Sequence, residues 1–219
     1  MVQPAGVQIN AGRALIEGDL TIPAKAAGLV VFSHGSGSSR FSRRNKSVAQ
    51  MLQAGGYATL LLDLLTRHED VIDEQTREYR FDVDRLGHRV VAAIDWSASH
   101  PEVARLPVAC FGASTGAAAA LIAAAERPEV VRAVISRGGR PDLAGYALPK
   151  LQAPTLLIVG GDDEPVIQLN RAAMRRMRAL VQLEIVPGAT HLFEEPGALE
   201  LVSQLALKWC TEYVKGAPK

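Results

Sequence analysis

The chain has few cysteines and almost no net charge, and each shortage excludes a class of protein. Two cysteines among 219 residues cannot build the disulfide framework of a small secreted domain. A formal net charge of +1 argues against a general nucleic-acid binder and against a protein held to anionic membranes by its overall field. We therefore expect no nucleic-acid partner, and we expect Cys110 and Cys210 to be small buried apolar residues.

The sequence also lacks a basic start followed by an apolar run, and no uninterrupted apolar segment is long enough to cross a bilayer. We expect a cytoplasmic protein with no membrane partner. Hydrophobic residues make up 48% of the chain and charged residues 21%, a balance typical of a globular enzyme. Because no stretch resembles a linker, we predict one domain over residues 1–219, as a monomer or a small homo-oligomer.

Short apolar runs alternate with segments of helical spacing. We predict strands over residues 7–9, 14–22, 28–33, 58–62, 108–111, 132–136, 155–159 and 181–186, and helical spacing over 45–52, 90–96, 114–127, 167–180 and 198–213. Residues 63–86 are polar and poorly periodic. This alternation predicts an α/β fold with a mostly parallel sheet and helices on both faces. The chain between residues 136 and 155 is too short for a large lid, which favours an open site.

The most informative stretch is the sequence around Ser114, where an apolar run meets an alanine-rich helix through Gly-Ala-Ser-Thr-Gly. This is the pattern of a nucleophile elbow, in which the serine sits on a strained turn and glycines at 112 and 116 remove colliding Cβ atoms. Ligands of parallel sheets bind beyond the carboxyl ends of the strands. We predict Ser114 as a nucleophile at such an end.

A serine nucleophile needs a base, and the base needs an acid to hold its tautomer. On this architecture the order along the chain is serine, acid, histidine, and His191 is the histidine that follows the acidic cluster 162–164. We predict His191 as the general base. The residues alone leave Asp162, Asp163 and Glu164 open as the acid.

The tetrahedral intermediate of acyl transfer needs hydrogen-bond donors for its oxyanion. The elbow supplies the N–H of Thr115, and the glycine-rich loop after the strand 28–33 offers a second. We favour the N–H of Ser36 and next that of Gly37. His34, in the same loop, is expected to support the scaffold.

Four motifs occur in one order: HGSGSS at 34–39, GASTG at 112–116, VGGDDEPV at 159–166 and ATHLFEEPG at 189–197. Together they resemble the dienelactone hydrolase-like branch of the α/β-hydrolase family over nearly the whole chain. The resemblance implies an eight-stranded α/β-hydrolase fold and the triad Ser114, Asp163 and His191, because the family pattern G-x-x-D-x-x-V places the acid at 163. True dienelactone hydrolases carry a cysteine nucleophile where this chain has Ser114. The implied function is therefore a serine-dependent hydrolase of small carboxylic esters or lactones, with no cofactor.

Arginines near strand ends are candidates for substrate binding. Arg137 and Arg140 flank two glycines after a strand, and Arg40, Arg43 and Arg44 follow the glycine-rich loop. Guanidinium groups there could hold a substrate carboxylate, and the alternative is ion pairing with acids such as Asp142. The short basic cluster 43–46 favours a solvated face. The scattered histidines lack zinc spacings, so we expect no metal.

Two other functions remain open from the sequence. The same triad serves thioesterases, peptidases and C–C hydrolases, because a fold does not fix the bond that is cleaved. A non-catalytic binding protein on this fold is the second alternative.

Overall fold

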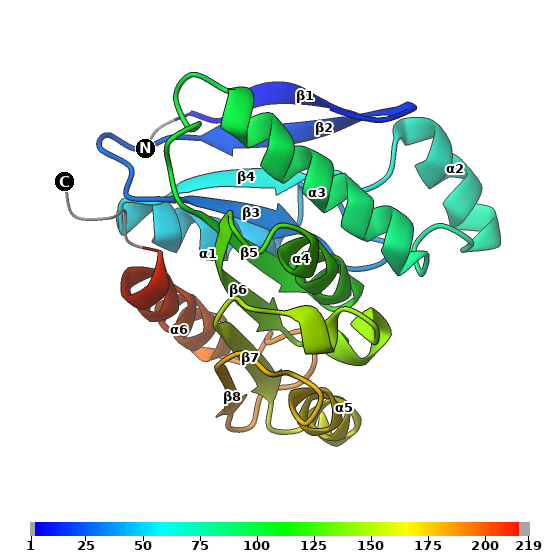
Figure 1. Ribbon diagram of the computed structural model, residues 1–219. Helices are drawn as coiled ribbons and strands as arrows, with labels where there is room; N and C mark the ends of the chain where they lie inside the picture. The colour runs from blue at the N-terminus through cyan, green and yellow to red at the C-terminus, as the bar shows by residue number, and fades with distance from the viewer. Residues whose placement is uncertain (1–2, 215–219) are drawn as a thin grey trace.

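The protein, described over residues 3–214 by a computed structural model, is built on one eight-stranded sheet with strand order β1-β2-β4-β3-β5-β6-β7-β8 (Figure 1). The strands are β1 (Ala5–Ala11), β2 (Ala14–Thr21), β3 (Leu29–Ser33), β4 (Ala58–Leu62), β5 (Val108–Ala113), β6 (Val131–Arg137), β7 (Thr155–Gly160) and β8 (Val181–Val186). β2 pairs antiparallel with β1 and with β4, and the other pairs are parallel. The mostly parallel α/β-hydrolase sheet predicted from the sequence is confirmed.

Helices cover both faces of the sheet. They are α1 (Arg43–Ala54), α2 (Arg67–Thr76), α3 (Val83–Ser99), α4 (Thr115–Glu126), α5 (Glu164–Met174) and α6 (Ala198–Tyr213). Figure 1 shows α1 and α6 on one face and α3, α4 and α5 on the other. Successive strand side chains point to opposite faces, so Phe32 of β3 lies in the core cluster with Leu52 of α1, whereas Val31 lies in the cluster with Leu121 of α4.

The polar region 63–86, for which no element was predicted, contains α2 and the start of α3. Asp73 is the one buried residue of α2, so the helix has no apolar stripe for periodicity to detect. Its signal is a capping box, in which Thr66 and Glu69 each bond the other's backbone N–H. Helix α5 also differs, because it begins at Glu164 and ends at Met174 rather than spanning 167–180.

The segment after β6 holds two short 3₁₀ helices, Pro141–Ala144 and Leu148–Lys150, and the chain then returns to β7. This agrees with the expectation that the chain between residues 136 and 155 is too short to form a large lid. No helix within residues 3–214 combines the length and apolarity needed to cross a bilayer.

Five neighbouring parallel strands, β3, β5, β6, β7 and β8, end at one edge of the sheet. Ser36, Ser114, Asp163 and His191 follow the ends of β3, β5, β7 and β8, and Arg137 is the last residue of β6. The topology therefore brings together residues that are as much as 155 positions apart in the sequence.

The chain after β4 is held by an ion-pair network around Glu69. Arg89 donates to both carboxylate oxygens of Glu69, at 2.7 and 2.9 Å, and also donates to the carbonyl oxygen of Leu64. Burial alone would raise the pKa of Glu69, but hydrogen bonds from Arg89 and Thr66 outweigh it and lower this pKa to about 2. The network anchors α2 to α3.

We predict that Glu69→Gln lowers the free energy of unfolding by about 2 kcal/mol at pH 7. Because the folded-state pKa of Glu69 lies below the unfolded value, its contribution is present above about pH 4.5 and is lost as the pH falls toward 2. Urea unfolding at pH 7 and at pH 3 measures the difference. The matched control is Glu74→Gln, at an exposed position of the same helix. Equal losses in the two variants, or a loss that does not shrink in acid, would contradict the prediction.

Candidate active site

Ser114 sits on a strained turn between β5 and α4. Its φ is 52° and its ψ is −122°, a left-handed conformation that costs a non-glycine residue about 1–3 kcal/mol. A Cβ on Gly112 would lie 2.4 Å from the Cα of Ala117, and one on Gly116 would lie 2.3 Å from the carbonyl oxygen of His34. The two glycines are therefore sterically required, as the elbow pattern predicts.

The end of β6 holds this turn from the side. The N–H of Ser114 donates to the carbonyl oxygen of Arg137 at 3.2 Å, and the N–H of Arg140 donates to the carbonyl oxygen of Ser114 at 3.1 Å. Gly138, at a φ of 51°, lets the chain turn between these two bonds, and a Cβ there would lie 3.0 Å from the carbonyl oxygen of His191. The loop after β6 thus contacts both the turn that carries Ser114 and the backbone of His191.

His191 Nδ1 lies 2.7 Å from Asp163 Oδ2. With the ring proton on Nδ1, His191 donates this bond, which leaves Nε2 free to accept a proton. Asp163 occupies the N-cap position of α5 but makes no side-chain capping bond. Asp162 and Glu164 are exposed. Of the three acids that the sequence left open, the structure pairs Asp163 with the histidine.

The loops that carry these two residues are tied to one another through the backbone. The N–H of Gly161 donates to Val186, and the N–H of Asp162 donates to Ala189 at 3.0 Å. A Cβ on Gly160 would lie 2.3 Å from the carbonyl oxygen of Ala189. The ends of β7 and β8 therefore approach closely, and this approach sets the distance between acid and imidazole.

Ser114 and His191 line one pocket of about 240 Å³ at the carboxyl edge of the sheet. Its other lining residues are Gly35, Ser36, Ser38, Ser42, Arg44, Asn45, Ala113, Arg137 and Leu192. The sequence names Arg44 as a possible partner of a substrate carboxylate, although the cluster 43–46 favours a solvated face, and it gives no role to Asn45. Asn45 is 2% exposed, and its place on the inner face of α1 is the signal that could have found it.

The two predicted oxyanion donors are in contact with each other. The N–H of Ser36 donates to Oγ1 of Thr115 at 2.8 Å. Thr115 is the first residue of α4, so its own N–H has no acceptor within the helix. Gly37 does not line the pocket, and a Cβ there would lie nearest to Arg80. The structure therefore places Ser36 at the pocket with its N–H bonded to Thr115, whereas neither Thr115 nor Gly37 is among the lining residues.

His34 lies in the loop after β3 and is 8% exposed. Its Nδ1 lies 2.8 Å from the carbonyl oxygen of Gly35, and its Nε2 accepts from the N–H of Leu64 at 3.0 Å. Burial lowers the pKa of His34. Because both ring nitrogens are occupied, His34 supports the loop that carries Ser36.

Arg40 lies among three carboxylates. It contacts Glu17 at 2.7 Å, Asp19 at 3.3 Å and also Asp63. Burial would lower its pKa, but these acids raise it. Arg40 therefore joins β2 to the chain after β4, and these acids neutralise its charge. Arg40 does not line the pocket of Ser114.

Arg140 and Arg137 differ from each other. Arg140 makes a two-pronged ion pair with Asp142, at 2.9 and 2.8 Å, which is the alternative weighed from the sequence. Arg137 is 7% exposed and lines the pocket with Ser114. We therefore retain Arg137, and not Arg140, as a candidate for substrate binding.

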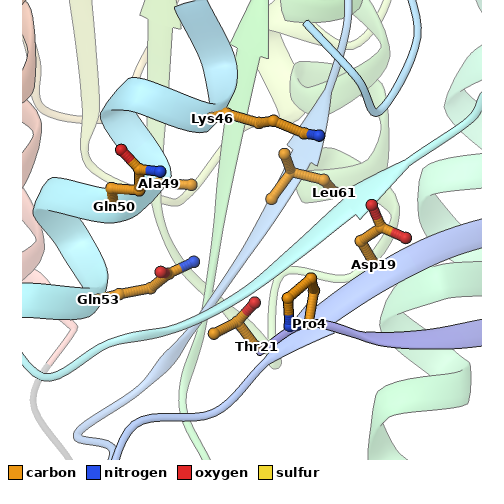
Figure 2. Close-up of a pocket in the computed structure, with 8 residues that line it drawn as sticks. All are labelled: Pro4, Asp19, Thr21, Lys46, Ala49, Gln50, Gln53 and Leu61. Carbon is orange, nitrogen blue, oxygen red and sulfur yellow. The ribbon is translucent and has the colours of Figure 1, made fainter. Parts of the chain in front are cut away.

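A second pocket, of about 190 Å³, lies on the same side of the sheet as α1 (Figure 2). It is lined by Pro4, Asp19, Thr21, Lys46, Ala49, Gln50, Gln53 and Leu61. None of the predicted site residues is among them, and the set contains no serine, cysteine or histidine. This pocket therefore lacks the serine and histidine that line the pocket of Ser114.

The fold and this site define an α/β hydrolase. The model of the dienelactone hydrolase family matches residues 16–215, and the chain belongs to this family. A dienelactone hydrolase from Anabaena variabilis is 54% identical, with a TM-score of 0.96 over 98% of this chain and 99% of that one. Est1E from Butyrivibrio proteoclasticus is 18% identical, with a TM-score of 0.77 over 94% of this chain and 98% of its own, which shows the fold alone.

Two curated proteins from Mycobacterium tuberculosis, strains CDC 1551 and H37Rv, are each 53% identical over 210 residues. Both bear the name "Putative phosphoribosyl transferase". The match covers 96% of this chain and 46% of each relative. The chain thus spans about half the length of these relatives.

We predict that Thr115→Val lowers the free energy of unfolding by about 1.5 kcal/mol, because the partly buried hydrogen bond from the N–H of Ser36 loses its acceptor. Thr115 is 3% exposed, and valine keeps its shape. Thr115→Ser keeps the hydroxyl and is expected within about 1 kcal/mol of the parent, since it loses one methyl group. Chemical denaturation of the three proteins tests this, and a serine variant as unstable as the valine variant would refute it.

Proposed function

We propose that the protein is a serine-dependent hydrolase of carboxylic esters or lactones. The observation that carries the proposal is the 2.7 Å contact between His191 and Asp163 at the pocket that His191 lines with the strained Ser114. A hydroxyl, an imidazole and a carboxylate placed in this way suit acyl transfer. Membership of the dienelactone hydrolase family supports the same reading.

In the proposed first step, Oγ of Ser114 attacks the carbonyl carbon while Nε2 of His191 takes the hydroxyl proton. The carbonyl electrons move to oxygen, and the N–H of Thr115 stabilises the resulting oxyanion. The N–H of Ser36, which in this structure donates to Oγ1 of Thr115, would have to break that bond to act as the second donor. Asp163 stabilises the imidazolium and remains ionised.

The intermediate then collapses. The bond from carbonyl carbon to the alcohol oxygen breaks, and His191 gives its proton to that oxygen, leaving an acyl group on Ser114. Water attacks the acyl carbon while His191 takes one of its protons. The bond from that carbon to Oγ of Ser114 then breaks, and His191 gives the proton to Oγ. The products are an alcohol and a carboxylic acid, or a hydroxy acid from a lactone.

The same steps would serve a thioester, and the name of the curated relatives suggests a phosphoribosyl group instead. We favour oxygen esters because the chain belongs to the dienelactone hydrolase family, and a lactone is a cyclic oxygen ester. The relatives' name describes proteins about twice as long as the matched part, and the site here supplies an activated nucleophile. A non-catalytic role would leave the Asp163 contact without a use.

We predict that Ser114→Ala lowers kcat for p-nitrophenyl acetate by at least about 10³-fold, because the acyl enzyme cannot form. Ser99→Ala, at an exposed position of α3, is the control and keeps full activity. Circular dichroism verifies that both variants are folded. A folded Ser114→Ala protein with activity near that of the parent removes the mechanism.

We also predict that Asp163→Asn lowers kcat by about 10³–10⁴-fold, because an amide would hold the wrong tautomer of His191. The adjacent Asp162→Asn changes an exposed carboxylate and is expected to stay within about threefold of the parent. Steady-state hydrolysis of the same ester measures both variants. Comparable losses at the two positions would show that Asp163 has no special role.

A further inference from the structure

The loop after β6 is held by three successive residues, each of which is bonded to a different part of the molecule. The N–H of Gly138 donates to a carbonyl oxygen of β7 at 2.8 Å, and the N–H of Arg140 donates to the carbonyl oxygen of Ser114 at 3.1 Å. Between them, the carbonyl oxygen of Gly139 accepts from Nδ2 of Asn170 at 3.0 Å. The bond from Asn170 is therefore one of the contacts that fix the loop beside the turn of Ser114.

Asn170 destabilises the helix in which it lies. It is a fully buried residue in the interior of α5, and asparagine is a poor helix former because its amide competes with the backbone for hydrogen bonds. Nδ2 donates back to the carbonyl oxygen of Val166 at 2.8 Å, whereas Oδ1 is buried with no partner in the part of the chain that the structure describes. A buried polar atom without a partner lowers stability, so α5 alone does not explain Asn170.

The bond between Asn170 and Gly139 joins two parts of the proposed triad. Helix α5 begins directly after Asp163, which occupies its N-cap position, and Asn170 lies about two turns further along the same helix. The loop after β6 belongs to the serine, because two backbone hydrogen bonds connect its ends to Ser114. The side-chain amide of Asn170 therefore connects the helix that follows the acid to the loop that holds the nucleophile.

The backbone at Gly139 packs tightly against its neighbours. A Cβ on Gly139 would lie 1.9 Å from Oγ of Ser136 and 2.6 Å from the Cβ of Ala117. Ser136 belongs to β6, and Ala117 belongs to α4, the helix that begins after the nucleophile elbow. A shift of Gly139 therefore changes the packing against α4 as well as the hydrogen bonds to Ser114.

The strain in the turn of Ser114 makes the turn dependent on these supports. Its φ of 52° is a conformation that a non-glycine residue keeps only where the surrounding contacts hold it. Without Asn170, the carbonyl group of Gly139 loses its donor, and the bond from Arg140 to Ser114 weakens as the loop moves. A nucleophile displaced by about 1 Å from its place beside His191 reacts up to about 100-fold more slowly.

We propose that Asn170 is a positioning residue for Ser114. Its side-chain amide holds the loop after β6 in the place from which the loop supports the strained turn of the nucleophile. The inference rests on the proposed ester hydrolysis and adds to it a residue that lies outside the pocket of Ser114. Its effect is therefore expected in the rate of the chemical steps and not in substrate binding.

The first test is Asn170→Ala, assayed with p-nitrophenyl acetate at a temperature where the parent and the variants are folded. We expect kcat to fall by about tenfold or more while KM stays within about threefold of the parent, since the pocket keeps its lining. Asn170→Thr is a second variant of nearly the same volume. In a helix its hydroxyl bonds back to the preceding turn, which leaves Gly139 without a donor, so we expect the same loss. This variant carries the test if Asn170→Ala does not fold.

Two controls separate positioning from stability. Gln168→Ala changes an exposed side chain of α5 and is expected to keep kcat within about twofold of the parent. Val103→Ala shortens a buried side chain that precedes β5, at the opposite end of this strand from Ser114. We expect it to lower the Tm by about 2–6 °C and to leave kcat unchanged. A folded Asn170 variant whose kcat is as high as that of Val103→Ala overturns the proposal, because Asn170 then only stabilises the fold.

Hydrogen exchange separates this inference from the proposed function, because it needs no substrate. The amides of Ser114 and Arg140 donate the two bonds between the elbow and the loop. We expect them to exchange about tenfold faster in Asn170→Ala than in the parent, whereas strand β4 exchanges equally in both. If the parent hydrolyses no ester but shows this pattern, hydrolysis is refuted and the support of the turn by Asn170 stands. If the parent hydrolyses the ester and the Asn170 variants keep its kcat, the positioning role is refuted and hydrolysis stands.

Discussion

The contact between Asp163 and His191 is the interaction on which the rest of the site depends. It joins the end of β7 to the end of β8 at 2.7 Å, and it fixes which ring nitrogen faces the pocket. Asp163 could have capped α5, yet its carboxylate turns to the imidazole and makes no capping bond. The backbone hydrogen bonds between the two loops hold the Asp163 carboxylate in this orientation, so the proposed base is positioned before any substrate binds.

Two features at the same edge of the sheet destabilise the folded protein, and the local structure around them does not explain why they are present. Ser114 adopts a left-handed conformation, and Arg137 is buried with no carboxylate partner among residues 3–214. A backbone hydrogen bond joins these two residues. Strain and unpaired charge that gather at one pocket are typical of sites where a ligand supplies the missing interaction. The proposed hydrolase would bind its substrate at this pocket.

The sheet could be predicted because its strands are short apolar runs, and the elbow because its glycines are sterically required. Helix α2 could not be found by periodicity, since Asp73 is its one buried residue and its stability rests on capping and ion pairs. Spacing left three adjacent acids open, and their orientation depends on the approach of β7 to β8. Arg40 and Arg137 both lie near strand ends in the sequence. Tertiary contacts pair Arg40 with three acids, whereas Arg137 has no carboxylate partner in the part of the chain that the structure describes.

The most direct measurement of the central claim is mass-spectrometric mapping of the residue modified by a fluorophosphonate, a reagent whose phosphorus is attacked by an activated serine with loss of fluoride. The account predicts one phosphonylated residue, Ser114, with a rate that falls sharply when His191 is replaced by glutamine. Unmodified Ser114 in the folded protein, or modification that proceeds equally fast without His191, would contradict it.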